Sequence, residues 1–306
     1  MRKKVCVITG ANAGIGKQAA IQMAKAGYTV VMACRSRERG EAALAEVQKQ
    51  SGSSDVALLL VDLSLMESVK RFAEEVLQRF AVIDVLIHNA AIFDVSQKQA
   101  VRTAEGHETV WMTNHVNPVY LTDLLLDALT KSENGRILTV ASKGLLAVPG
   151  LKVDLQDPEF TTRKFKMATA YYQSKRAQIM FTFYLAEKLK NTNVTVNCIR
   201  VPAVRVDIGR HPNLSAFTKW VYKQKSKKAL PPEAMAVVYT YLATSDDVKT
   251  VTGRYFDENR RQVQPNAYTR SKENIRAVVS LTYQYLNRRK ADEPKEEPAL
   301  AQGNVL

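Results

Sequence analysis

The chain of 306 residues is 46% hydrophobic, which is enough for a substantial core and excludes general disorder. Its formal net charge of +14 suits an anionic ligand such as a phosphorylated cofactor, or an anionic membrane surface. The basic residues are spread along the chain and form no recognisable nucleic-acid module, so nucleic-acid binding is not expected. No apolar run approaches the ~18 residues of a membrane span, and the three cysteines and four histidines form no metal-binding cluster, so we expect a cytoplasmic protein with buried free thiols and no metal.

The chain opens with an apolar run, a glycine turn and a helical segment. Residues 5–8 are expected to form a buried strand, and Gly10, Gly14 and Gly16 then lead into a helix over about residues 15–26. Such a turn leaves backbone N–H groups unpaired at a helix N-terminus, and the missing Cβ atoms let a pyrophosphate approach them. A plain tight turn would also explain a glycine triplet, but here it begins an alternation of strands and helices, which favours dinucleotide binding.

Strand-like and helix-like segments alternate after this turn. Further strands are expected at residues 28–34, 56–61, 83–88, 136–141, 194–199 and 251–256, and the main helices at about 38–50, 65–79, 114–130, 169–190 and 270–289. Ser64 and Glu67 have the spacing of a capping box at the start of one of these helices. Right-handed crossovers between parallel strands place helices on both faces of a sheet. The pattern therefore predicts an α/β protein, a single Rossmann-type doubly wound domain with a seven-stranded, mostly parallel sheet.

Several small or polar residues fall at the carboxyl ends of the predicted strands, where ligands bind in such sheets. They are Thr9, Arg35, Asp62, Asn89, Ser142 and Pro202. At the end of the second strand an acid would favour NAD, whereas a base accepts the 2′-phosphate of NADP. The chain has Arg35 there and no acid before Glu38, and Lys17 could assist from the first helix, so NADP(H) is predicted; surface arginines without a ligand are the alternative.

A possible acid–base pair lies on the helix expected over residues 169–190. Tyr171 and Lys175 are four residues apart and therefore point the same way, one turn apart. A phenol with a pKa near ~10 is a poor acid–base catalyst at neutral pH, but an adjacent ammonium stabilises the phenolate. Such pairs arise by chance on many helices; Ser142 at a preceding strand end and the upstream nucleotide turn favour the functional interpretation.

Together these motifs resemble the short-chain dehydrogenase/reductase family, and within it the retinol dehydrogenase-type members, over about residues 4–260. The resemblance rests on the glycine turn, the Asn-Ala-Ala of residues 89–91, the Val-Ala-Ser of residues 140–142 and the Tyr-x-x-Ser-Lys signature of residues 171–175. It implies that the cofactor is bound by Gly10, Asn12, Gly14, Ile15, Gly16, Arg35, Asp62, Leu63, Asn89, Ala90, Lys175, Pro202 and Val204.

The same resemblance implies four catalytic roles. Tyr171 would protonate the alkoxide formed as hydride reaches a carbonyl, or deprotonate the alcohol in reverse, and Ser142 would hydrogen-bond that oxygen. Lys175 would lower the pKa of Tyr171 and hold the nicotinamide ribose. Asn114 would position a water in a proton relay behind the lysine.

Three positions depart from the family pattern. Ala91 replaces a usual glycine, Ala203 replaces the glycine of a Pro-Gly pair, and Val206 lacks a hydroxyl that commonly contacts the carboxamide. The nicotinamide end of the cofactor would therefore be held more loosely or by other groups. The resemblance divides the chain into a catalytic domain over 1–260 with a lid at about 205–232, a helical extension over 261–289 and a disordered tail over 290–306.

The lid would cover the substrate, and its composition is unusual. Apolar and aromatic residues lie among lysines there: Phe217, Trp220, Val221 and Tyr222 with Lys219, Lys223, Lys225, Lys227 and Lys228. An ordinary solvated helix explains this mixture, and a lid that also touches an anionic membrane as a peripheral contact is the alternative. Leu145, Leu146 and Val148 would complete an apolar pocket. By resemblance, the substrates are apolar carbonyl compounds or alcohols such as retinoids, steroids or fatty aldehydes.

Two hypotheses of different class follow. The first is an NADP-dependent carbonyl reductase or alcohol dehydrogenase; the second is a non-catalytic NADP-binding interaction protein, for which Ala203 and Val206 speak. The family also implies a homodimer or homotetramer formed through the helix of Tyr171. An apolar face would allow that pairing, and core packing explains it equally well; its residues are Ile179, Phe181, Phe183 and Leu185.

Overall fold

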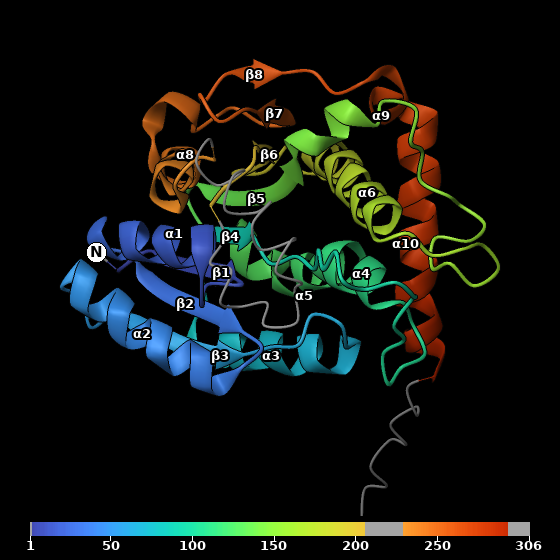
Figure 1. The fold of residues 1–306 in the computed structure, drawn as a ribbon. Coiled ribbons are helices and arrows are strands. Elements are labelled where there is room, and N and C mark those ends of the chain that lie inside the picture. Colours follow the sequence, from blue (N-terminus) through green and yellow to red (C-terminus); the bar gives the residue numbers. More distant parts are fainter. Residues whose placement is uncertain (1, 206–228, 293–306) are drawn as a thin grey trace, which may run out of the picture.

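A computed structural model describes residues 2–205 and 229–292 and shows one large parallel sheet between two layers of helices (Figure 1). The strand order is β3-β2-β1-β4-β5-β6-β7-β8, and only the β7–β8 pair is antiparallel. The strands are β1 (Val5–Thr9), β2 (Thr29–Cys34), β3 (Val56–Leu60), β4 (Val85–His88), β5 (Gly135–Ser142), β6 (Val194–Val201), β7 (Arg254–Phe256) and β8 (Gln262–Val263).

The Rossmann-type fold predicted from the sequence is confirmed, with one strand more than expected. β8 has only two residues and was missed, because so short an element carries no alternation of apolar and polar side chains. The order of the strands reverses direction between β1 and β4, which creates the crevice where ligands bind in doubly wound sheets.

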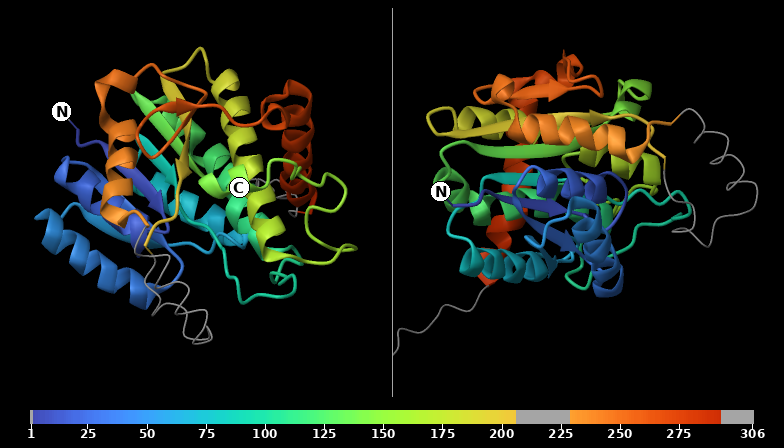
Figure 2. Two further views of the ribbon diagram at one scale, coloured as in Figure 1. Left: turned by 45° about the horizontal axis from the view of Figure 1, so that its top comes forward. Right: turned by 90° about the vertical axis from the view of Figure 1, so that its left-hand side faces the viewer.

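The helices cover both faces, as the two further views show (Figure 2). One face carries α1 (Gly14–Lys25), α2 (Arg37–Ser51) and α8 (Pro232–Thr244), and the other carries α3 (Met66–Arg79), α5 (Asn117–Thr130) and α6 (Met167–Lys188). Shorter turns are α4 (Thr109–Trp111), η1 (Met112–Val116), η2 (Lys143–Ala147), η4 (Asp246–Val248) and α9 (Ala267–Arg270). Each face buries its own apolar cluster against the sheet, and Cys6, Cys34 and Cys198 are buried free thiols, as predicted.

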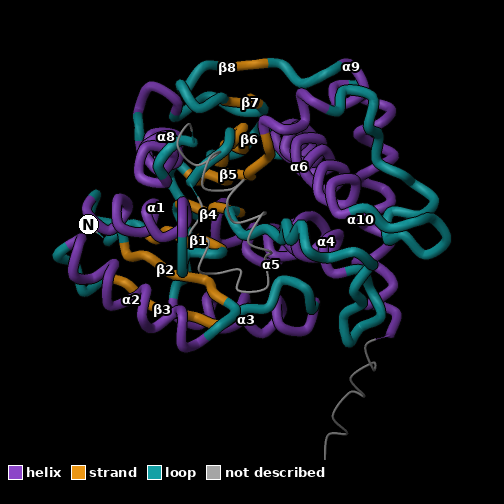
Figure 3. Tube along the Cα trace, in the orientation of Figure 1, coloured by secondary structure: helices purple, strands orange, loops and turns teal. Residues whose placement is uncertain are grey.

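The helix α10 (Lys272–Asp292) lies outside α6 and packs along it (Figure 3). It begins after a break at Ser271 and runs to Asp292, whereas the sequence predicted a helix over 270–289 followed by disorder; residues 293–306 lie outside the described residues. Phe181 and Leu185 of α6 are buried in the same cluster as Val278 of α10. Core packing therefore accounts for Phe181 and Leu185 of this apolar face. Pairing of two copies through α6 stays a prediction.

The start of α3 differs from the prediction. The N-cap residue is Leu65, and the predicted capping box of Ser64 and Glu67 does not form. Instead, the Glu105 carboxylate, from a distant loop, accepts hydrogen bonds from the backbone N–H groups of Met66 (2.8 Å) and Glu67 (3.1 Å). A cap that is supplied from 38 residues away leaves no local sequence signal.

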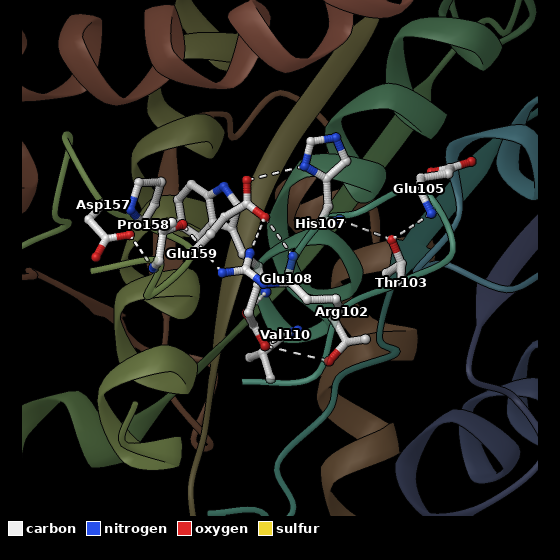
Figure 4. A network of polar contacts seen from close by, with 12 residues as sticks. Arg102, Thr103, Glu105, His107, Glu108, Val110, Asp157, Pro158 and Glu159 are labelled. Atoms are coloured by element: carbon white, nitrogen blue, oxygen red, sulfur yellow. Dashed lines mark hydrogen bonds and ion pairs between the residues drawn. The ribbon is translucent and has the colours of Figure 1, made fainter. Parts of the chain in front are cut away.

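The loop that carries Glu105 is fastened to the rest of the fold by a polar network (Figure 4). Glu159 accepts hydrogen bonds from the Glu108 backbone N–H (2.5 Å) and from Arg102 (3.1 Å), and it contacts His107 Nδ1 at 3.1 Å. The Glu108 carboxylate in turn caps α4 by accepting from the N–H groups of Val110 and Trp111. This network fixes the segment that enters the turn η1.

Replacing the remote cap tests this account of α3. Glu105→Ala should lower the free energy of unfolding by about 1 kcal/mol, because two first-turn N–H groups lose their acceptor. Glu67→Gln is the matched control and should change stability by only a few tenths of a kcal/mol, measured by urea unfolding. Equal losses in the two variants would restore the capping box and contradict the remote cap.

The His107–Glu159 contact predicts a pH-dependent stability. The hydrogen bond to Glu159 raises the pKa of His107; burial alone would raise the pKa of Glu159, but the hydrogen bonds from His107, from the Glu108 N–H and from Tyr285 lower it. The contribution of His107 is complete below its unfolded pKa of about 6.5 and is lost as pH rises through the raised folded value; that of Glu159 is lost as pH falls through its lowered value.

The free energy of unfolding of the wild type should therefore exceed that of His107→Gln most between about pH 5 and 6.5, by up to about 1 kcal/mol. The difference should shrink toward pH 9. A difference that stays constant from pH 5 to pH 9 would show that the His107 charge contributes nothing.

Candidate functional site

A cavity of about 850 Å³ lies along the carboxyl ends of β1, β2, β3 and β4. Ten of the residues predicted to bind the cofactor line it: Gly10, Asn12, Gly14, Ile15, Arg35, Asp62, Leu63, Asn89, Ala90 and Val204. Gly16, Pro202 and Lys175 do not line it, and neither do Asn114, Ser142 and Tyr171. Of the six strand-end positions singled out in the sequence, Arg35, Asp62 and Asn89 line the cavity, because parallel strands bring their carboxyl ends to one edge.

The glycine turn forms one wall of the cavity. Gly10 and Gly14 have positive φ angles of 67° and 55°. A Cβ atom at Gly16 would lie 2.4 Å from both the Gly10 carbonyl oxygen and Asn89 Nδ2, so only glycine lets the helix approach this closely. No side chain caps α1, whose first N–H groups have no partner within the helix. Beside Gly14 the space is open, and this open, positively polarised helix end fits a pyrophosphate.

The turn is held in place by the two strands that flank the reversal of strand order. Asn89 Nδ2 donates to the carbonyl oxygens of Thr9 (3.0 Å) and Gly10 (3.3 Å), and Thr9 Oγ1 accepts from the Ala90 N–H at 3.1 Å. Tyr239 of α8 donates to Asn89 Oδ1 at 3.4 Å. Asn89 therefore positions the turn as well as lining the cavity.

The end of β2 supplies the positive charge of the cavity. Arg35 is exposed and lines it, and so does Arg39, one turn further along. Arg39 was missed because its role depends on α2 beginning at Arg37, with Ser36 as its N-cap. Lys17 also lines the cavity, but its ammonium is paired with the Glu46 carboxylate. The guanidinium groups of Arg35 and Arg39 are thus the groups that could bind an additional phosphate.

The segments at the other strand ends are ordered by local contacts. Asp62 accepts hydrogen bonds from the backbone N–H (2.9 Å) and the hydroxyl (2.7 Å) of Ser64, which fixes the turn after β3. After β6, the Leu230 N–H donates to the Ala203 carbonyl and the Arg205 N–H donates to the Leu230 carbonyl, at 3.0 and 2.9 Å. Most of the predicted lid, with Val206 and the residues 217–228, lies outside the described residues.

Ser142 and Tyr171 form a hydrogen-bonded pair at the end of β5, and neither lines the cavity. Burial raises the pKa of Tyr171 to about 12, and the hydrogen bond with Ser142 opposes that rise. The Lys175 ammonium donates to the Val140 carbonyl at 2.8 Å and lies 5.8 Å from the centre of the Tyr171 ring. Burial lowers the pKa of Lys175 to about 8. In this structure the Lys175 ammonium therefore lies beside the Tyr171 ring, and its effect on the pKa of Tyr171 stays a prediction.

Asn114 lies in the middle of the π-helical turn η1, a local insertion that is common at functional sites. Its Oδ1 accepts from the Ile92 N–H at 2.7 Å, and its Nδ2 donates to the Ile92 carbonyl (3.0 Å) and to Ser174 Oγ (3.2 Å). The side chain thus ties the segment after β4 to α6. Its main-chain carbonyl accepts from Gln178 Nε2 at 2.9 Å.

An aromatic residue that the sequence did not single out covers the predicted acid. The ring of Phe93 lies 4.4 Å from that of Tyr171, centroid to centroid, and 6.3 Å from that of Tyr172. Phe93 lines the cavity and is 40% exposed. It comes from an irregular segment, so no periodicity could indicate it.

The predicted apolar pocket of Leu145, Leu146 and Val148 is not confirmed by the described residues. Leu145 is buried and Val148 packs in a small core cluster with Ile179, whereas Leu146 is 60% exposed. None of the three lines the cavity. The lid that would line this pocket with them lies outside the described residues, so the pocket stays a prediction.

The chain matches a protein family and several known relatives. The model of the short chain dehydrogenase family matches residues 4–152. Human retinol dehydrogenase 13 is 34% identical over 83% of this chain and 76% of its own length. Human retinol dehydrogenase 14 is also 34% identical, over 89% of this chain and 83% of its own.

Solved structures share the fold. A protein of Mycobacterium paratuberculosis superposes with a TM-score of 0.69 at 25% identity, covering 93% of both chains. A short chain dehydrogenase of Shigella flexneri, solved in complex with NADP, has a TM-score of 0.62 at 22% identity and covers 85% of this chain and 98% of its own.

Proposed function

The chain belongs to the short-chain dehydrogenase family, and we propose that it is an NADP(H)-dependent oxidoreductase that reduces apolar aldehydes or ketones. The family uses a nicotinamide cofactor, and the observation that carries the proposal is the paired Ser142 and Tyr171 next to a cavity with an open glycine turn. The comparisons support a dehydrogenase or reductase; the cofactor type, the residue roles and the substrate are our inference.

The preference for NADP(H) rests on the charge at the end of β2. Arg35 and Arg39 line the cavity, and neither has an ion-pair partner among the described residues. A 2′-phosphate would satisfy these guanidinium groups, whereas the ribose hydroxyl of NAD would not. The Shigella flexneri structure holds NADP, but at its level of identity it supports the fold alone.

A nicotinamide cofactor held by the glycine turn and Arg35 would supply the hydride for reduction of a carbonyl carbon. Tyr171 then gives its phenolic proton to the carbonyl oxygen, and Ser142 donates a hydrogen bond to the same oxygen as negative charge develops there. The raised pKa of Tyr171 keeps the phenol protonated at neutral pH, which is the state that this direction requires. The Lys175 ammonium would stabilise the phenolate that remains and hold the nicotinamide ribose.

The proposed substrate class follows from the surroundings of Tyr171 and from the relatives. The half-exposed Phe93 ring offers an apolar face beside the phenol, and the relatives carry the name retinol dehydrogenase. Both favour a retinal-, steroid- or fatty-aldehyde-like carbonyl. No helix among the described residues could cross a membrane; the cytoplasmic location, peripheral membrane contact and oligomeric state stay predictions.

Turnover measured with matched tyrosine variants tests the proposed chemistry. We expect NADPH oxidation with apolar aldehydes, and Tyr171→Phe should reduce kcat by about 10²- to 10⁴-fold, because the proton donor is lost. Tyr172→Phe removes the neighbouring hydroxyl and should change kcat by no more than a few fold. Binding of NADPH without turnover of any aldehyde or ketone would favour the non-catalytic binding protein instead.

The cofactor preference has its own matched pair. Arg35→Ala should raise the KM for NADPH by about tenfold or more and leave the KM for NADH nearly unchanged, because one charged hydrogen bond to a phosphate is lost. Arg37→Ala, whose guanidinium is exposed and pairs with Glu41, should change neither. An equal effect of Arg35→Ala on both cofactors would contradict 2′-phosphate recognition.

A further inference from the structure

Two buried histidines have nearly the same surroundings. His88 Nε2 lies 2.7 Å from Thr122 Oγ1, and His115 Nε2 lies 2.7 Å from Thr282 Oγ1. In both rings Nδ1 is buried and has no hydrogen-bond partner among the described residues. Buried acceptors without partners are rare, and each calls for an explanation such as a bound water.

The tautomer of His88 follows from its neighbour. Thr122 Oγ1 donates its proton to the Pro118 carbonyl at 2.8 Å, so it can only accept from the imidazole. His88 Nε2 therefore carries the hydrogen and Nδ1 presents a lone pair. Because burial lowers the pKa of His88 to about 3, the ring is neutral at physiological pH and Nδ1 is a permanent acceptor.

The position of His88 distinguishes it from His115. His88 pairs with Thr139 of β5, and the Lys175 ammonium donates to the carbonyl of the next β5 residue, Val140. Both side chains lie on the face covered by α5 and α6, since His88 contacts Thr122 and Lys175 comes from α6. The charge of Lys175 also contributes to the lowered pKa of His88, so the ammonium lies near the imidazole.

Gln178 supplies a second buried acceptor, on the same helix as Lys175. It lies three residues after Lys175 on α6, and its Nε2 donates to the Asn114 carbonyl at 2.9 Å. Its Oε1 is buried and, in the described part of the chain, has no partner. Lys175 is 2% exposed, and only one of its three N–H groups, the one on Val140, has an acceptor within residues 2–205 and 229–292. Gln178 Oε1 and His88 Nδ1 are thus buried acceptors without a partner in the described part of the chain, and Lys175 retains N–H groups that can donate.

We propose that a buried water joins Lys175 Nζ to His88 Nδ1 and Gln178 Oε1, and that His88 is a positioning residue that keeps Lys175 charged. A water needs two to four polar partners in such a site, and these three groups supply them. The effect of this water on catalysis rests on the proposed function, in which the Lys175 ammonium stabilises the Tyr171 phenolate. The presence of the water does not rest on the proposed function.

The remaining groups around Lys175 cannot replace this contact. The titratable neighbours are Tyr171 on its own helix and Cys198 on β6, and burial raises their pKa values to about 12 and about 11, so both are neutral at pH 7. No carboxylate among the described residues shifts the pKa of Lys175. With burial alone lowering that pKa to about 8, the charge of Lys175 depends on uncharged acceptors.

The pH profile of kcat/KM for NADPH-dependent reduction tests the role of His88. The alkaline limb reports the loss of the Lys175 proton, and in His88→Phe it should move down by about one pH unit, because one hydrogen bond to the cation is lost. His88→Asn keeps an amide oxygen near the Nδ1 position and should restore the limb. His115→Phe creates a comparable lesion beside Thr282 of α10 and should leave the limb in place.

A crystal structure of the wild-type enzyme at high resolution provides the second measurement. It should show a water within hydrogen-bond distance of Lys175 Nζ and His88 Nδ1. A dry site, or equal alkaline limbs in folded His88→Phe and His115→Phe, would overturn the proposal. An enzyme without NADPH-dependent turnover but with this water in place would refute only the proposed function.

Discussion

The hydrogen bonds of Asn89 to the backbone of Thr9 and Gly10 are the contacts on which the site depends. They join the ends of β1 and β4 where the strand order reverses, and they hold the glycine turn in a conformation that leaves the first N–H groups of α1 free. Gly16 completes the arrangement, because a side chain there would collide with both Asn89 and the Gly10 carbonyl. The same contacts therefore position the cavity wall, the N-terminus of α1 and the junction of β1 with β4.

Burial acts in opposite directions on the two titratable groups of the proposed centre. It keeps the Tyr171 phenol protonated and makes the Lys175 ammonium easier to deprotonate. A site built in this way favours proton donation to a carbonyl oxygen, provided that Lys175 retains its charge. Hydrogen bonds to uncharged groups, such as the Val140 carbonyl, stabilise the charge of Lys175, since no carboxylate of the described residues is paired with this lysine.

Much of this could be predicted from the sequence, because it depends on patterns that are local in the chain. Apolar runs gave the strands, and their ends gave Gly10, Arg35, Asp62 and Asn89 as cavity residues. What failed depends on distant partners or on local irregularity. Glu105 caps α3 from another loop, and Phe93 covers Tyr171 from an irregular segment. Arg39 required the start of α2 to be known within one residue.

The central claim is that hydride passes from a nicotinamide cofactor to a carbonyl carbon beside Tyr171. Incubation of the enzyme with NADPH carrying deuterium at both C4 positions of the nicotinamide and with a long-chain aldehyde tests it directly, with mass spectrometry of the alcohol as the readout. The account predicts one deuterium on the carbinol carbon, and none in the Tyr171→Phe variant above its residual rate. An alcohol without deuterium, or no alcohol from any apolar aldehyde despite bound NADPH, would contradict it.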